Sequence, residues 1–235
     1  MVQLSLSLFG GFAISLDGAP VTEFDSNKVR ALLAYLAVES ARAHRRESLA
    51  TLLWPGYPNR SARSNLRNAL AGLRTAIGDR EAELPFLLIT RETLQFNRES
   101  DHWLDVEVFS QTLPRVDQVP IERLAEVADL YTGDFLAGFT LEDAVGFDDW
   151  TSVTGVRLRR QVLELLGKLV DRLEAAGALD RALAYAWKQL GLDRRREKVH
   201  RKVMALLAMT GKRSAALAQY GVCCRMLVDA RERGG

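Results

Sequence analysis

The feature that most restricts the fold of this chain is a self-match at an offset of 34 residues in its second half. The residues shared by the two copies are Lys168, Leu173, Gly177, Ala182, Leu183 and Ala184, which recur as Lys202, Leu207, Gly211, Ala216, Leu217 and Ala218. Glycine at a fixed place is typical of a turn after a helix, and small residues let two helix axes approach to about 8–10 Å. The second half is therefore predicted to stack antiparallel helix pairs.

Helical spacing extends upstream of this repeat, so the whole of 101–235 is predicted to be helical. Further helices are expected at 121–131 and at about 150–176, the latter with acidic residues at its start. A period of 34 residues is that of tetratricopeptide repeats. We expect a tetratricopeptide-like domain over 101–235.

The first hundred residues follow a different pattern. Residues 3–9 and 12–16 alternate apolar and polar positions, and Asp17-Gly18 is a strong tight-turn pair, so this segment predicts strands. Helical spacing then replaces the alternation. The predicted helices are 28–40, 46–54 and 62–77, and Pro55 ends the second of them.

Two short β runs, 87–90 and 94–96, are joined by a polar turn and predict a hairpin. Strands, three helices and a hairpin, in that order, describe a winged helix-turn-helix over 1–100. In this fold the third helix reads DNA and the hairpin, or wing, contacts the flanking backbone. The fold class is thus mainly α with small β-sheets: a winged helix-turn-helix followed by helical repeats.

The helix predicted at 62–77 has one apolar stripe and one face of small polar residues, with arginines along its flank. The span 60–77 contains no acidic residue, and small side chains with Asn and Arg suit entry into the major groove. A solvated helix surface is the alternative. The candidate base- and backbone-contacting residues are Arg60, Arg63, Ser64, Arg67, Asn68, Ala71, Arg74 and Thr75.

Basic residues near the starts of the first two helices are candidates for phosphate anchoring, since side chains and helix N-termini both bind phosphate there. They are Lys28, Arg30, Arg45 and Arg46. Arg91 and Thr93 at the hairpin tip, with Arg98 beyond it, are the candidate wing contacts.

The net charge of +2 conceals a strong pattern along the chain. Residues 26–80 hold ten Lys/Arg against three Asp/Glu, 101–150 hold two against twelve, and 151–235 hold eighteen against eight. A basic first half suits a polyanion, although each segment is also compatible with a solvated face. The densest basic run, 194–202, is compatible with a solvated helix start, a second DNA contact or a partner for the acidic segment.

Signals for catalysis, metals and cofactors are weak. His44, His102 and His200 have no metal-binding spacing, and the adjacent Cys223 and Cys224 can form neither a disulfide framework nor a zinc site. The acidic residues Glu142, Asp143, Asp148 and Asp149 could hold a divalent cation, but helix capping suits them better. We expect no enzyme activity, no cofactor, no metal and no membrane span, and a cytoplasmic location.

Several segments together resemble the SARP-type family of bacterial transcriptional activators. They are Phe9-Gly-Gly-Phe12, 28–36, 49–55 with its Leu-Trp-Pro end, 62–70 with Arg-Ser-Asn-Leu-Arg-Asn, 131–136 and 211–220. The resemblance implies an OmpR-like winged helix followed by a bacterial transcriptional activator domain. The chain departs from the family at 91–96, where Arg-Glu-Thr-Leu-Gln-Phe replaces the usual Gly-Tyr pair of the wing.

These patterns predict a sequence-specific DNA-binding regulator, an activator, that inserts helix 62–77 into the major groove. The expected partners are double-stranded DNA, RNA polymerase and a second copy of the chain, since the helical repeats would dimerise or engage the transcription machinery. The alternative is a tetratricopeptide-type protein–protein adaptor whose winged helix does not bind DNA.

Overall fold

The computed structural model describes residues 3–232, with side chains described for residues 3–228. By packing, residues 3–111 and 130–159 form one compact unit, called unit 1 below, and residues 112–129 and 160–232 form unit 2. The domain boundary predicted after residue 100 stays a prediction, because unit 1 also takes in segments beyond it.

Unit 1 contains a four-stranded sheet in the order β3-β2-β1-β7. Its strands are β1 (Leu4–Ser7), β2 (Ala13–Leu16), β3 (Ala19–Pro20) and β7 (His102–Leu104). The predicted alternation of 3–9 and 12–16 is confirmed, with Leu4, Leu6 and Leu8 buried. β7 pairs in parallel with β1, Leu4 opposite His102. A three-residue strand is too short to show a period, so the sequence did not indicate it.

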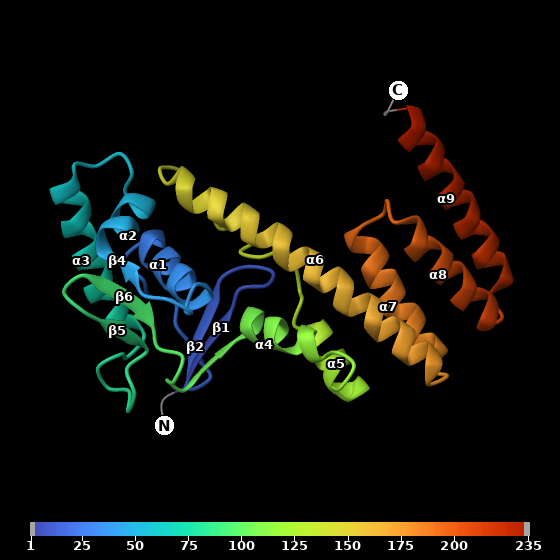
Figure 1. Cartoon of the computed structure of the whole chain (residues 1–235), viewed down its shortest axis with the longest axis horizontal. Coiled ribbons are helices and arrows are strands. Elements are labelled where there is room, and N and C mark those ends of the chain that lie inside the picture. The colour runs from blue at the N-terminus through green and yellow to red at the C-terminus, as the bar shows by residue number, and fades with distance from the viewer. Residues whose placement is uncertain (1–2, 233–235) are drawn as a thin grey trace. The chain divides into compact units, whose positions relative to one another are not determined.

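Three helices and a second sheet complete the winged helix-turn-helix (Figure 1). The helices are α1 (Asn27–Val38), α2 (Arg46–Leu53) and α3 (Asn59–Ala76), and the sheet has the order β4-β6-β5 with β4 (His44–Arg45), β5 (Leu87–Ile89) and β6 (Thr93–Phe96). α3 begins at residue 59, three residues before the predicted start, because residues 59–61 are polar and exposed and carry no apolar residue to mark the start. The predicted hairpin is β5–β6, with a turn over 90–92.

One buried carboxylate ties the segment after β7 to the first sheet. Asp105 begins α4 (Asp105–Thr112) and is 2% exposed. Its Oδ2 accepts hydrogen bonds from the backbone N–H groups of Leu8 at 2.7 Å and Phe9 at 2.8 Å. Burial raises the pKa of Asp105, and these hydrogen bonds oppose the rise. The first sheet therefore depends on a residue that lies almost 100 positions away in the chain.

Unit 2 consists of helices and the short 3₁₀ turn η1 (Leu113–Arg115) within the described residues. Its helices are α5 (Ile121–Asp129), the second half of α6 (Val145–Ala175), α7 (Leu179–Leu192), α8 (Glu197–Met209) and α9 (Arg213–Glu232). Figure 1 shows α7, α8 and α9 following one another side by side.

The two copies of the sequence repeat end their first helices in the same way. Gly177 and Gly211 have φ of 74° and 76°, a conformation that glycine adopts without a Cβ penalty. The N–H after each glycine bonds back to the helix, Ala178 to the Leu173 carbonyl at 2.9 Å and Lys212 to the Leu207 carbonyl at 2.8 Å. These are Schellman turns, and they confirm the predicted helix-pair repeat.

Candidate nucleic-acid interface

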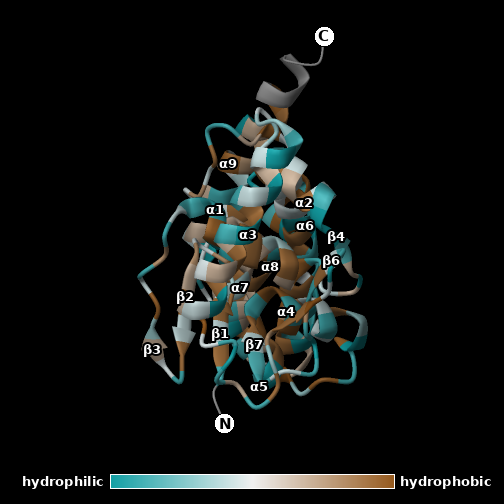
Figure 2. Ribbon diagram, turned by 90° about the vertical axis from the view of Figure 1, so that its left-hand side faces the viewer, coloured by the Kyte–Doolittle hydropathy of each residue, from teal (hydrophilic) through white to brown (hydrophobic). Residues whose placement is uncertain are grey.

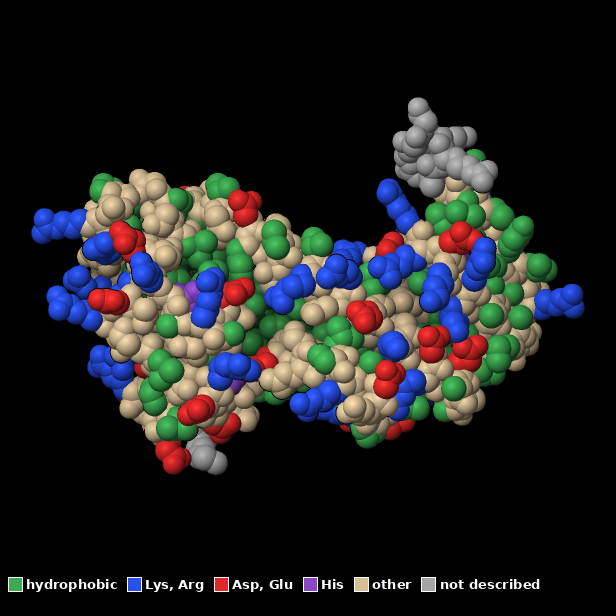
Figure 3. Space-filling model, in the orientation of Figure 1, with side chains coloured by type: hydrophobic (Ala, Val, Ile, Leu, Met, Phe, Trp, Pro, Cys, Tyr) green, Lys and Arg blue, Asp and Glu red, His purple; other side chains and the backbone are tan. Residues whose placement is uncertain are grey.

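The outward face of α3 is polar and open to solvent. Leu66, Ala69, Leu70 and Leu73 are buried, as the periodicity predicts. Seven of the eight candidate residues of this helix are exposed: Arg60, Arg63, Ser64, Arg67, Asn68, Ala71 and Thr75. Figure 2 views this side of unit 1 directly, with α3 in front and hydrophilic residues along it. In Figure 3, Lys and Arg side chains gather on the side of unit 1 where α3 lies.

Arg46 connects the start of α2 to the turn of the wing. Its backbone N–H donates to the Glu92 carbonyl at 2.9 Å, and its Nε–H donates to the Thr90 carbonyl at 3.1 Å. Burial lowers the pKa of Arg46, and the nearby charge of Arg67 lowers it further. Two guanidinium groups that repel each other at the surface are a place where a phosphate is stabilising, because an anion relieves the repulsion.

Several arginines of this surface have no acidic partner. In the part of the chain that the structure describes, the side chains of Arg45, Arg60, Arg67 and Arg91 form no ion pair, and all four are exposed. Arg63 bonds to Glu47 at 2.9 Å, but both side chains are more than half exposed, so solvent screens the pair. The tip of the wing, the start of α2 and the first half of α3 thus share an excess of unpaired positive charge.

Of the eight α3 candidates, Arg74 is the one that is not exposed, and it binds a buried acid. Its Nε–H donates to Asp79 Oδ2 at 2.7 Å, and the Asp79 side chain is fully buried. The other oxygen of Asp79 accepts the backbone N–H of Leu87, the first residue of β5, at 2.9 Å. Arg74 therefore balances a buried charge that fastens the wing, which favours a structural role for Arg74 over a contact with DNA.

Two of the predicted phosphate anchors are also engaged inside unit 1. Lys28 forms an ion pair with Asp143 at 2.6 Å, and its ammonium lies 5.3 Å from the centre of the Trp54 ring. Arg30 lies over the ring of Phe24 at 5.3 Å and donates to the Thr22 carbonyl. These contacts favour a structural role over phosphate binding, since each cation already has a partner.

Two of the predicted wing residues are likewise occupied. Arg98 follows β6 and pairs with Glu107 of α4 at 3.5 Å, and the Thr93 hydroxyl lies 2.8 Å from that of Thr90 across the turn. Glu107 also bonds to His102 at 3.1 Å, so Arg98 belongs to a network at the α4 side of unit 1. Arg91 is the wing candidate that stays exposed and unpaired among the described residues.

A loop that the sequence did not single out flanks the second half of α3. Residues 20–25 and the side chains of Asn68, Ala71 and Thr75 line an open hollow of about 1130 Å³. The loop brings the exposed acids Glu23 and Asp25, and the Asp25 carboxylate lies directly against Gly72. A glycine in the middle of a helix is a signal of close approach, so Gly72 could have indicated this neighbour.

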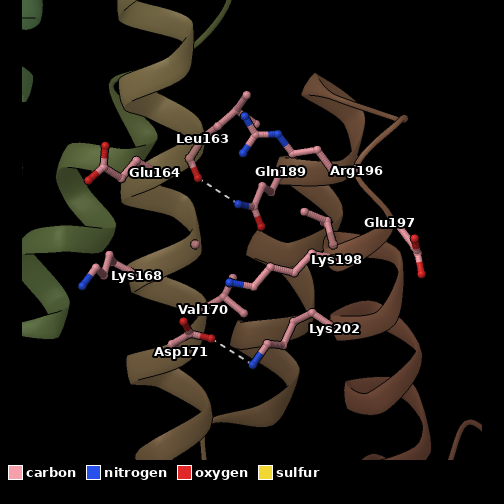
Figure 4. Close-up of a pocket in the computed structure, with 12 residues that line it drawn as sticks. Leu163, Glu164, Lys168, Val170, Asp171, Gln189, Arg196, Glu197, Lys198 and Lys202 are labelled. Atoms are coloured by element: carbon pink, nitrogen blue, oxygen red, sulfur yellow. Dashed lines mark hydrogen bonds and ion pairs between the residues drawn. The ribbon is translucent and has the colours of Figure 1, made fainter.

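Unit 2 has a groove between α6, α7 and α8, with a volume of about 430 Å³ (Figure 4). Its basic and acidic groups largely satisfy one another. Lys202 bonds to Asp171 at 2.9 Å and to Glu174 at 2.6 Å, and the Gln189 amide donates to the Leu163 carbonyl at 2.8 Å. The groove therefore offers little unpaired charge to a ligand.

The remaining histidine, cysteine and acidic candidates, all within residues 3–228, do not form a common metal site. His44 bonds to the Glu39 carbonyl, Cys223 is buried, and Asp148 accepts the Leu141 N–H at the start of α6. Within the described residues, His, Cys, Asp and Glu side chains form no group of three that could hold a metal ion. In the same part of the chain, each helix is too short or too polar to cross a bilayer.

The sequence and the fold were compared with those of known proteins. Residues 105–232 match the family described as the bacterial transcriptional activator domain. No significant match to a curated protein was found. The fold is similar to that of Mycobacterium tuberculosis EmbR, solved in complex with a low-affinity phosphopeptide, with a TM-score of 0.72 and 19% sequence identity. The match covers 97% of this chain and 60% of that protein's chain.

Proposed function

We propose that this chain, which belongs to the bacterial transcriptional activator domain family of transcriptional regulators, binds specific duplex DNA through unit 1 and activates transcription. The observation that carries the proposal is the set of exposed arginines just before α2, in α3 and in the wing that form no ion pair among the described residues. Binding a phosphate backbone needs such charges.

The first half of α3, together with Asn68 directly after it, is the part proposed to enter the major groove. Arg60, Arg63, Ser64 and Arg67 are exposed there, and the helix N-terminus adds its partial positive charge. Beyond Asn68, the helix lies beside Glu23 and Asp25, which repel phosphates. The duplex is therefore expected to approach α3 from its N-terminal side.

Arg45, Arg46 and Arg91 then hold the backbone on either side of the helix. Arg46 is fixed between α2 and the wing turn by its bonds to residues 90 and 92, so little side-chain entropy is lost when phosphate binds. Arg91 at the wing tip is placed for the adjacent minor groove. Lys28, Arg30 and Arg98 are not part of this proposal.

Protein partners are proposed for unit 2. The similar protein was solved with a phosphopeptide, but this chain spans 60% of that protein, so we take from it only the idea that a protein ligand joins DNA in regulation. RNA polymerase and a second copy of the chain are the candidates that the sequence suggested. An adaptor without DNA binding is the alternative function.

A mobility-shift assay on random-sequence duplex DNA separates these functions. For the regulator, we expect binding at about 50 mM salt that weakens by roughly 10²- to 10⁴-fold at about 200 mM, because bound phosphates release counterions. Absence of binding at the lower salt concentration would favour the adaptor.

Asn68 tests whether α3 reads bases. It is exposed on the outward face, and an Asn side chain can bond bidentately to adenine, so Asn68→Ala should weaken binding to a selected operator by roughly 10- to 100-fold, with little change on random DNA. The matched control is Asn65→Ala on the flank of the same helix, with both variants checked by circular dichroism. Equal losses on operator and random DNA for Asn68→Ala would mean that α3 does not present this face to the bases.

A further inference from the structure

A second hollow in unit 2 shares no lining residue with the groove of Figure 4. It is lined by the C-terminal half of α7, the turn into α8 and the middle of α9, and it has a volume of about 560 Å³. Its apolar wall consists of Trp187 and Leu190 from α7 with Val222 and Met226 from α9. Trp187 is 43% exposed, which leaves a large aromatic surface in contact with water.

The rim of this hollow is basic. Arg194 and Arg195 come from the α7–α8 turn and Arg225 from α9. All three are exposed, and their side chains form no ion pair within the described residues. The neighbouring Arg196, in contrast, bonds to Asp193 at 2.8 Å. Three guanidinium groups beside an apolar wall thus have no acidic partner among the side chains that the structure describes.

A buried hydrogen-bond chain holds the rim in place. The Gln219 amide of α9 lies 2.6 Å from Nδ1 of His200 in α8, and Nε2 of His200 lies 2.9 Å from the Arg194 carbonyl. With the amide donating to Nδ1, Nε2 carries the proton and donates to the carbonyl. Both side chains are buried, so the turn that bears Arg194 and Arg195 is fixed to the floor of the hollow before any ligand binds.

We propose that this hollow binds an acidic amphipathic peptide segment of a partner protein. The apolar side chains of the segment would cover Trp187, Leu190 and Val222, and its carboxylates would pair with Arg194, Arg195 and Arg225. Charge complementarity selects this occupant: the rim is wholly basic, so an acidic ligand gains three ion pairs and a basic one gains none. DNA fits less well, because a phosphate backbone offers no apolar side chain to cover the indole and its neighbours.

Fluorescence anisotropy with a labelled 16-residue peptide tests the proposal. The peptide carries Leu and Trp on one helical face and Glu on the other, and it is titrated with the full chain at low salt without DNA. We expect saturable binding, at least tenfold weaker for the matched peptide with Gln in place of Glu. The double variant Arg195→Gln/Arg225→Gln should also bind at least tenfold more weakly, and Trp187→Ala should do the same.

The control is Arg213→Gln, which removes an exposed arginine of α9 that does not line the hollow. It should leave peptide binding unchanged, and all variants should retain the thermal unfolding of the parent chain. Equal binding of the Glu and Gln peptides, or equal losses in Arg213→Gln and the double variant, would overturn the proposal. Duplex DNA binding that the double variant abolishes, without any peptide binding, would assign the hollow to nucleic acid. Because the peptide assay contains no DNA, its failure leaves the proposed function of unit 1 untouched.

Discussion

The basic residues of the α3 surface and those of unit 2 differ in what they contact. On α3 and its neighbours, Arg60, Arg67 and Arg91 face solvent without an acid among the described residues. In unit 2, several basic side chains join one helix to another, whereas Arg194, Arg195 and Arg225 form no ion pair among the described residues. Arg181 pairs with Glu122 at 2.7 Å, Lys188 with Asp129 at 3.1 Å, and Lys212 with Asp180 at 2.9 Å.

The acids of α5 therefore neutralise part of the basic excess of 151–235, for which the sequence left a solvated face as the alternative to a binding surface. The two regions show that an excess of Lys and Arg in a segment does not by itself indicate a binding surface. What matters is whether the fold supplies a carboxylate within reach of each cation.

The largest expected effect is a loss of stability when the paired arginine of α3 is removed. Arg74→Ala leaves the buried Asp79 without its cation, which should lower the free energy of unfolding by about 2–4 kcal/mol. Urea unfolding followed by circular dichroism measures the loss. Asp79→Asn combined with Arg74→Ala should recover part of it, because no buried charge then remains. A stability equal to that of the parent chain would contradict the structural role of Arg74.

Removing the unpaired arginines of α3 should weaken DNA binding and not lower stability. Arg60→Ala/Arg67→Ala is expected to weaken binding to any duplex by roughly 10- to 100-fold and to lower the salt slope by about 2. The control is Arg181→Ala/Lys212→Ala, which removes the same charge from paired positions of unit 2. If the two double variants lose affinity equally, net charge and not the α3 surface determines binding.

Lys28, a cation close to α3, tests the rule that a basic side chain already paired with an acid does not bind phosphate. Because its ammonium is already paired with Asp143 and covered by Trp54, Lys28→Met should leave the salt slope of DNA binding unchanged, and it should cost at most about 1 kcal/mol of stability. A slope lowered by about 1 would return Lys28 to the set of phosphate contacts.

The smallest expected effect is a pH dependence in the network that holds Arg98. The hydrogen bond that His102 donates to Glu107 raises the pKa of His102, and the same bond lowers the pKa of Glu107. The His102 contribution to stability is therefore fully present below its unfolded pKa of about 6.5 and is lost as the pH rises through the raised folded value. Melting temperatures measured from pH 5 to 9 should fall over this window, and Glu107→Gln should flatten the decline. A parallel decline in the variant would show that other groups cause it.

The sequence by itself determined the elements of this protein and their faces. The alternation in residues 3–16, the apolar stripe of α3 and the recurrence of Gly177 at Gly211 each depend on near neighbours in the chain, so their outcome could be predicted. The exposure of Arg60, Arg67 and Asn68 followed from the same periodicity.

Only the tertiary structure decided which of the cations remain unpaired. Arg74 was predicted to be exposed on the flank of α3, and Asp79, which binds it, is buried by the packing of the wing. Lys28 meets an acid 115 residues away, and β1 pairs with β7, in which His102 lies opposite Leu4. Periodicity assigns a side chain to a face of its own helix, but an ion pair depends on a second segment, whose position is fixed by the packing of the core.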